Sequence, residues 1–377
     1  MDYEFFKVMW WLFIAVLLIG FAVMDGHDMG IGMMLPFVGK NDVERRVIVN
    51  SIGAHWEGNQ VWLVAGAGSI FAAWPMVYAT AFSGFYWAML AVLWAMFFRP
   101  VGFKYRSMVS NPTWRNTWDW GLFVGSFVPA LIFGVAFGNL LLGVPFHFDN
   151  NLYSYYTGSF WALLNPFALL CGLVSVFMML AHGGLYLAHR TEGVIRERSL
   201  KVMTVAAVIT LVLFTAAGFW VAGIDGYRIT SVIDTNGFPD VLGKTVELAK
   251  GAWLDNFRAE PALWAVPAAA YVGLLLAVWM ARMGKTFTAF WFSAIGLGGI
   301  AATAGVAMFP FIMPSSSMPA SSLTVWDGTS SHFTLIVMTF VVCILLPIIV
   351  IYTSWAFRVM RGKVTAEYIR ENDHTLY

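Results

Sequence analysis

The sequence predicts an all-α integral membrane protein with about nine transmembrane helices, and three observations support this fold class. Hydrophobic residues make up 59% of the chain, charged residues make up 11%, and the mean hydropathy is +0.72. A water-soluble chain of this composition would aggregate. Apolar stretches of about 20 residues, enough to cross about 30 Å of hydrocarbon, recur along the chain. Lys and Arg residues gather in alternate loops between these stretches, as they do in membrane proteins.

The candidate helices lie near 8–30, 50–74, 79–101, 119–143, 160–188, 200–223, 260–281, 287–309 and 333–357. The first stretch has no basic leading region and no cleavage site, so we expect it to be a retained helix and not a signal peptide. An N-terminus outside the membrane places 17 of the 22 Lys and Arg residues in cytoplasmic segments. The other basic residues are Lys7 and four in one long outer loop, 224–259. We therefore expect the C-terminus to be cytoplasmic.

The chain is expected to form a single membrane domain over residues 1–377. The outer loop has mixed charge and room for at most one short amphipathic helix, and the cytoplasmic segment 190–201 is compatible with two four-helix bundles plus one peripheral helix. Cys171 and Cys343 both lie in apolar runs, which excludes a disulfide framework or a CxxC site. The net charge of +1 excludes a nucleic-acid-binding surface.

Polar residues interrupt the first two candidate helices at a common depth. At 1.5 Å per helical residue, Glu57 lies roughly 16 Å from Arg46, and Asp28 lies roughly 18 Å from Lys40, with Asp25 one turn deeper. Three unpaired carboxylates at this depth would cost about 8 to 10 kcal/mol. Water, partner side chains or protonation must offset that cost.

Two interpretations of these acids remain open. In a purely structural one, Asp25, Asp28, Glu57, His55 and Asn59 hydrogen-bond one another and fasten two helices together, with GHDMG (26–30) as a contact of small residues. In a functional one, the carboxylates hold and pass protons along a file of side chains and water.

Long ordered blocks of the sequence resemble a known family, subunit II (the CydB-type subunit) of the bacterial cytochrome bd quinol oxidases. They include DGHDMGIG (25–32), NDVERRVIVNSIGAHWEGNQVWL (41–63), FFRPVGFKYR (97–106) and MFPFIMPSSSMPASSLTVWD (308–327). The resemblance implies a multi-pass protein of the bacterial inner membrane, in a complex that oxidises quinol, reduces dioxygen to water and takes protons from the cytoplasm.

The resemblance also implies how the work is divided in that complex. Subunit I would ligate two hemes b and one heme d, and this chain would hold no catalytic residue and no metal. The chain would instead supply a scaffold, a proton route, an oxygen route through the apolar interface and, in some members, a structural quinone. Small single-helix accessory subunits and lipid would be further partners. Glu57 would conduct protons together with Asp25, Asp28, His55 and Arg99, and Trp62 would lie near the oxygen route.

Several residues fit the resemblance less well. Position 27 is usually aromatic in the family and is His27 here, and position 104 is commonly acidic and is Lys104 here. His182 matches no family ligand position, so we interpret it as a core histidine. His27 and His55 could face each other as heme ligands, but each neighbours an acid and equally suits a hydrogen bond. A proton-coupled transporter is the alternative function, because it would also bury carboxylates at mid-depth. A transporter would purify alone and colourless, and an oxidase subunit would purify with a heme-bearing partner.

Overall fold

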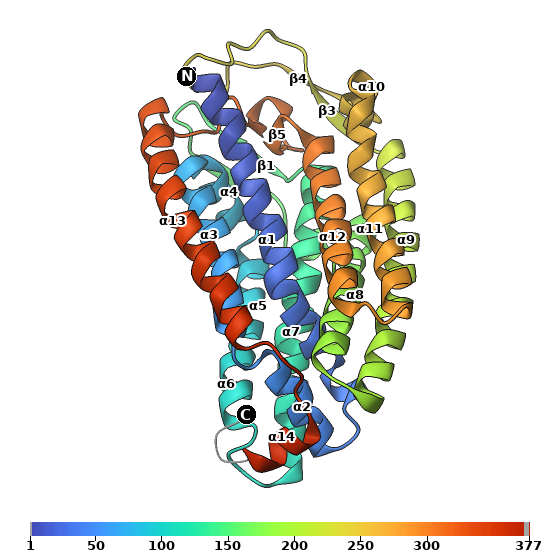
Figure 1. Ribbon diagram of the computed structural model, residues 1–377. Helices are drawn as coiled ribbons and strands as arrows, with labels where there is room; N and C mark the ends of the chain where they lie inside the picture. The colour runs from blue at the N-terminus through green and yellow to red at the C-terminus, as the bar shows by residue number, and fades with distance from the viewer. Residues whose placement is uncertain (1, 373–376) are drawn as a thin grey trace.

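Long apolar helices dominate the computed structural model, which describes residues 2–372 and 377. Within these residues, eight helices are long and apolar enough to cross a membrane, or nine if one bent pair counts as a crossing. The helices form an elongated bundle with the two chain ends at its opposite ends (Figure 1). The expected all-α membrane architecture is confirmed.

The main helices range in length from 8 to 36 residues. They are α1 (Tyr3–Val38), α2 (Asp42–Ile52), α3 (Trp56–Ala73), α4 (Pro75–Gly84), α5 (Tyr86–Met96), α6 (Phe98–Tyr105), α7 (Pro112–Leu142), α8 (Pro166–Arg190), α9 (Gly193–Gly223), α11 (Ala265–Arg282), α12 (Thr286–Met308) and α13 (His332–Val359). Two short helices, α10 (Asp255–Ala259) and α14 (Ala366–Glu371), lie outside the long ones.

The expected helices at 50–74 and 79–101 have the wrong bounds. A turn at residues 53–55 separates α2 from α3, and α3 and α4 meet at an angle of 119°. Pro75 explains the second break, because a proline disfavours helical geometry in the residue before it, and Trp74 has φ −130° and ψ 66°. The apolar crossing that follows runs from Tyr86 to Tyr105 through α5 and α6.

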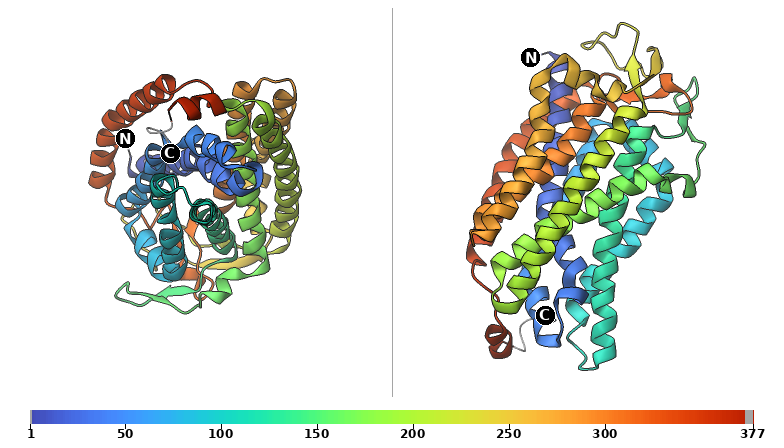
Figure 2. Two further views of the ribbon diagram at one scale, coloured as in Figure 1. Left: turned by 90° about the horizontal axis from the view of Figure 1, so that it is seen from below. Right: turned by 90° about the vertical axis from the view of Figure 1, so that its right-hand side faces the viewer.

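Helix α1 is the central element of the bundle. It packs against α3, α7, α8 and α12. An added Cβ at Gly30 of α1 would lie 2.1 Å from the Met179 carbonyl oxygen and 2.9 Å from the Gly183 Cα of α8, so only glycine allows this approach. Helix α13 lies at the periphery (Figure 2), and Leu335 is its one buried residue. The division into two four-helix bundles and the single-domain assignment stay predictions.

Short hairpins cover the end of the bundle that holds the N-terminus. The expected outer loop contains a two-stranded sheet, β3 (Asp225–Ile229) with β4 (Val246–Lys250), which the mixed charge of the loop did not indicate. Two smaller antiparallel pairs lie nearby: β1 (Phe146–Phe148) with β2 (Ser154–Tyr156), and β5 (Phe311–Met313) with β6 (Leu323–Thr324).

Two buried lysines fix the connecting segments at this end. The Lys7 ammonium donates to the carbonyl oxygens of Thr235, Gly237 and Trp326 at 2.8 to 3.2 Å. The Lys244 ammonium lies 2.8 Å from a carboxylate oxygen of Asp327. Burial raises the pKa of Asp327, and the Lys244 ammonium opposes that rise. The loop is therefore tied to α1 and to the segment before α13.

Candidate functional site

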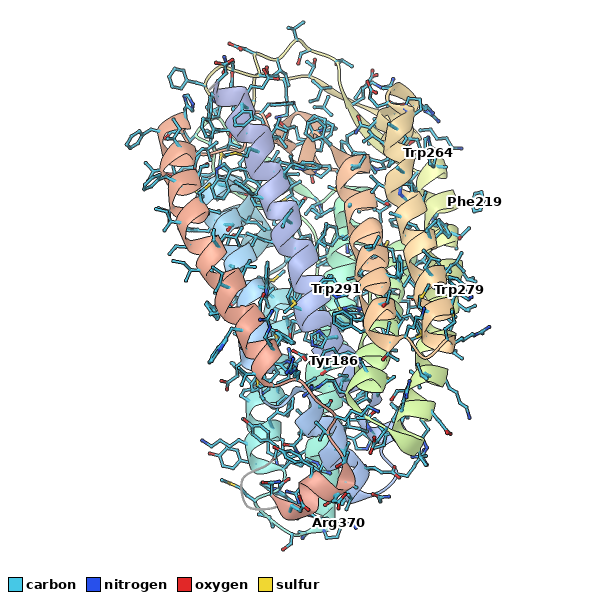
Figure 3. The ribbon with its side chains drawn as sticks, in the orientation of Figure 1. Tyr186, Phe219, Trp264, Trp279, Trp291 and Arg370 are labelled. Carbon is cyan, nitrogen blue, oxygen red and sulfur yellow. The ribbon has the colours of Figure 1, made fainter. Side chains whose placement is uncertain are left out.

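Four of the six residues expected to carry protons or oxygen come together at one place inside the bundle. They are Asp25 and Asp28 of α1, His55 in the turn before α3, and Arg99 of α6, and each is less than 9% exposed. The close contact between α1 and α8 adds His27, His182 and Tyr186 to the same place. Tyr186 lies among the helices in the half of the bundle nearer the C-terminus (Figure 3).

Asp25 and Arg99 form a buried ion pair with two parallel hydrogen bonds. The guanidinium Nη1 and Nη2 donate to the carboxylate oxygens at 3.0 and 2.6 Å. Both side chains are at most 1% exposed. Paired hydrogen bonds of this kind are among the strongest polar contacts, and the two charges offset each other. The pair therefore joins α1 to α6 without a water molecule between the two charges.

Asp28 belongs to a separate chain of hydrogen bonds. The Asn59 amide Nδ2 donates to Asp28 Oδ2 at 2.8 Å and lies 3.0 Å from His55 Nδ1. The Tyr186 hydroxyl lies 2.8 Å from His55 Nε2. The resulting sequence, Asp28 to Asn59 to His55 to Tyr186, joins α1, α3 and α8. It confirms that Asn59 links the first helices, as the structural interpretation expected.

His27 lies against the free oxygen of Asp28. Its Nε2 is 3.2 Å from Asp28 Oδ1, and its ring stacks on Tyr186 with centroids 4.2 Å apart. Its Nδ1 lies 3.0 Å from the carbonyl oxygen of Val23. Neither His27 Nε2 nor Asp28 Oδ1 has a hydrogen-bond partner among the residues that the structure describes.

His182 is a core histidine, as expected. Its Nε2 lies 3.0 Å from the Val23 carbonyl oxygen and its Nδ1 lies 2.5 Å from Ser293 Oγ. The ring stacks on Phe290. Sequence reasoning did not select Tyr186, although its spacing of four residues from His182 places both on one face of a helix.

A small cavity adjoins Asp28 and Arg99. The cavity has a volume of about 10 Å³, and Ser126 is its third polar lining residue. That is room for about one water molecule. Apolar side chains of α1, α2, α6 and α7 complete the lining, among them Leu35, Ile48, Phe103 and Leu122.

Charged residues form a separate layer toward the end of the bundle that holds the C-terminus. Asp119, which is fully buried, pairs with Arg45 and Arg106, and Asp42 pairs with Arg106 and Arg115. Arg106 lies seven residues beyond Arg99, roughly 10 Å along a helix. The cavity lies between this layer and the Asp25–Arg99 pair.

Glu57 does not join the cluster, contrary to the expectation that the three carboxylates bond one another. Its side chain is exposed and forms no hydrogen bond or ion pair with the residues that the structure describes. Glu57 and Asn59 are two positions apart on α3. Two helical steps correspond to a rotation of about 200°, so the two side chains point to opposite sides of the helix. Glu57 instead begins an exposed stripe on α3 with Val61, Val64, Gly68 and Phe71.

Trp62 also lies apart from the cluster. It is half-buried and packs over α1, where an added Cβ at Gly20 would lie 2.5 Å from its ring. It packs against an apolar cluster whose buried members include Phe21 and Leu297.

Comparison with known proteins gives a consistent result. A family model for cytochrome bd terminal oxidase subunit II matches residues 6–360. Cytochrome bd-I ubiquinol oxidase subunit 2 of Escherichia coli strain K12 is 56% identical over 377 residues, covering 100% of both chains. The probable cytochrome oxidase subunit 2 of Haemophilus influenzae is 50% identical over 376 residues, with the same coverage. A chain of the bd oxidase from Geobacillus thermodenitrificans has the same fold, with a TM-score of 0.66 and 14% identity over 94% of this chain and 98% of that chain.

Proposed function

The chain belongs to the family of cytochrome bd terminal oxidase subunit II, and we propose that it acts as the scaffold and the proton and oxygen route for subunit I. It is a multi-pass subunit of a quinol-oxidising oxidoreductase complex of the bacterial inner membrane. The proposed reaction reduces dioxygen to water with protons taken from the cytoplasm. The observation that carries the proposal is the buried hydrogen-bonded file from Asp28 to Tyr186.

The packing around the histidines argues that the hemes of the complex belong to subunit I. The rings of His27 and His55 are 5.6 Å apart, and Asp28, Asn59 and Tyr186 fill the space around them. The adjoining cavity has room for about one water molecule, which is far too little for a porphyrin. These residues do not fit a heme, so we assign no heme chemistry to this chain.

The proton route is proposed to begin at the charged layer of α2, α6 and α7, on the cytoplasmic side. The cavity would hold a water molecule that reaches Asp28 and Arg99. Asp28 can hold a proton because the positive charge of the neighbouring Arg99 is already offset by Asp25, and the Asn59 amide keeps the Asp28 carboxyl group in place. The Asn59 amide does not titrate, so it aligns its two neighbours, and the proton would pass between Asp28 Oδ1 and His55 Nδ1, which lie 3.8 Å apart. His55 and Tyr186 extend the route, since both have groups that can accept and donate a proton.

The exposed stripe of α3 is proposed to face subunit I. Its members Glu57, Val61, Val64, Gly68 and Phe71 follow spacings of four, three, four and three residues, which keep them on one face. A carboxylate facing lipid at this depth would cost about 2.5 to 3.5 kcal/mol, so a protein neighbour suits Glu57 better. Glu57 would then pass protons between the two subunits.

An oxygen route is proposed through the apolar packing at Trp62. Dioxygen is small and apolar, so it favours hydrocarbon-like surroundings over water. The half-buried Trp62 ring lies at the contact of α3 with Gly20 of α1, beside other apolar side chains.

Breaking the hydrogen-bonded file should slow the oxidase. In Asn59→Leu the link between Asp28 and His55 is lost, so we expect quinol-driven oxygen consumption per heme d to fall several-fold. Asn139→Leu is the matched control, because Asn139 is also a buried membrane asparagine but bonds only to Val135, Leu163 and Asn165. It should leave turnover per heme d unchanged. Equal turnover in both variants would remove Asn59 from the route.

A bulky side chain on the stripe should disturb the contact with subunit I. Gly68 of α3 and Gly218 of α9 are both membrane glycines at which an added Cβ would meet nothing within 4 Å. Gly68→Phe should therefore lower the amount of subunit I that co-purifies with this chain by at least about half, and Gly218→Phe should not. Full recovery of subunit I with Gly68→Phe would place the interface on another face. The expected loss follows from the cost of overpacking a close contact, about 1 to 3 kcal/mol.

A further inference from the structure

Two nitrogen atoms and one oxygen atom of the buried cluster converge on one point. We propose that His27 Nε2, Asp28 Oδ1 and His55 Nδ1 bind a divalent transition-metal ion of the zinc class, which pins the turn before α3 to α1. All three atoms lie within 4.8 Å of one another, and all three residues are buried. Two imidazoles and one carboxylate are a donor set that suits zinc and its neighbours in the first transition row.

The hydrogen bonds of His27 determine which of its nitrogens is free. A carbonyl oxygen can only accept, so the contact with Val23 places the proton of a neutral His27 on Nδ1. The lone pair of Nε2 then faces Asp28 Oδ1 at 3.2 Å. Two lone pairs that face each other in a buried site repel unless a positive species lies between them.

A proton would also satisfy those two atoms, whereas the third, His55 Nδ1, lies 3.0 Å from the Asn59 amide, a contact that an ion would replace. His55 Nδ1 lies 3.8 Å from the same Asp28 oxygen. Zinc ligands at about 2.0 to 2.2 Å in tetrahedral geometry lie about 3.4 Å apart. The spacing of His27 and Asp28 is close to this value. The Asp28–His55 spacing exceeds it, and the three atoms lie within 4.8 Å of one another, so His55 has to move toward both other ligands when an ion binds.

Each proposed ligand is held from behind, as metal-binding side chains usually are. His27 donates to the Val23 carbonyl, Asp28 accepts from Asn59, and His55 lies 2.8 Å from the Tyr186 hydroxyl. Asn59 Nδ2 also lies against His55 Nδ1, and it would keep only its bond to Asp28 when an ion binds.

The surrounding charges favour a cation. Arg99 offsets Asp25, so Asp28 is the carboxylate of this cluster without a paired base. A divalent ion would leave one excess positive charge, which the carboxylate ligand and a water molecule in the adjoining cavity would partly disperse. Zinc is a suitable probe of this site because it has no redox chemistry of its own.

The test measures zinc directly in the assembled oxidase, purified without a polyhistidine tag. The complex is equilibrated with zinc chloride, passed through a desalting column, and analysed for zinc and iron by plasma mass spectrometry. We expect about one zinc per complex above the background of a matched variant. In His27→Phe that zinc should be lost, because Phe can still stack on Tyr186 but offers no ligand. His182→Gln is the control, since it removes a buried histidine that is not a proposed ligand and should keep the zinc.

A second measurement reports the coordination itself. Zinc-edge X-ray absorption of the loaded wild type should show nitrogen and oxygen ligands that include imidazole, with no sulfur. Wild type without bound zinc, or equal zinc in wild type and His27→Phe, would overturn the proposal. An ion at Asp28 would also slow turnover, a consequence that rests on the proposed proton route. Zinc bound without loss of turnover would count against that route and would leave the metal site standing.

Discussion

Arg99→Met should leave little assembled oxidase in the membrane. The guanidinium of Arg99 is buried and forms two hydrogen bonds to Asp25, which is itself fully buried. Removing one member of such a pair lowers the free energy of unfolding by about 3 to 5 kcal/mol, because the other charge stays buried without compensation. The measurement is the fraction of this chain recovered in the heme-containing complex, which should fall at least about tenfold.

A double variant separates the charge from the packing. Asp25→Leu combined with Arg99→Met removes both charges, and replacement of buried ion pairs by apolar residues is often neutral. We expect the double variant to recover at least half of the assembled complex. Normal assembly of Arg99→Met alone would show that Asp25 finds a proton or another partner, and that the pair does not hold α1 to α6.

The fold was largely predictable because hydrophobicity determines where a chain can cross a membrane. The lengths and positions of α1, α7, α8, α9, α11, α12 and α13 follow from apolar stretches with charged ends. The breaks around α3 were not predictable from hydropathy, because the turn at His55, with φ −135°, and Pro75 interrupt the helix without changing the apolar character of the segment that follows. The β3–β4 hairpin was missed because its short strands carry no clear alternation of polar and apolar residues.

The depth of the candidate site was predictable from the sequence, but the directions in which its side chains point were not. Counting residues from the basic residues expected on the cytoplasmic side brought Asp25, Asp28 and Glu57 to a common level, and the structure buries the first two in one cluster with His55. The same count could not show that Glu57 points away from Asn59, because it used the rise of the helix and not its rotation. Tyr186 was missed because it lies in an apolar run on a distant helix, and its contact with His27 depends on the glycines of α1 and α8.

Glu57→Gln should slow turnover by on the order of tenfold or more while the hemes remain in place. Glutamine keeps the size and the hydrogen bonds of the side chain but cannot release a proton, and positioned proton transfer contributes about 10² to 10⁴ in rate. Glu57 is the carboxylate on the exposed stripe of α3, so the substitution removes the titrating group that we place between the subunits. Quinol-driven oxygen consumption per heme d is the measurement.

Two comparisons decide what the Glu57 result means. Glu57→Asp keeps a titrating carboxylate and should restore most of the activity, whereas a purely structural contact would tolerate Gln at least as well as Asp, because interhelical hydrogen bonds in membranes average only about 0.6 kcal/mol. Glu260→Gln changes another exposed glutamate, at the end of the bundle that holds the N-terminus, and should have no effect. Equal turnover in Glu57→Gln and wild type, with normal heme content, would remove Glu57 from the proton route and leave the stripe of α3 with a packing role alone.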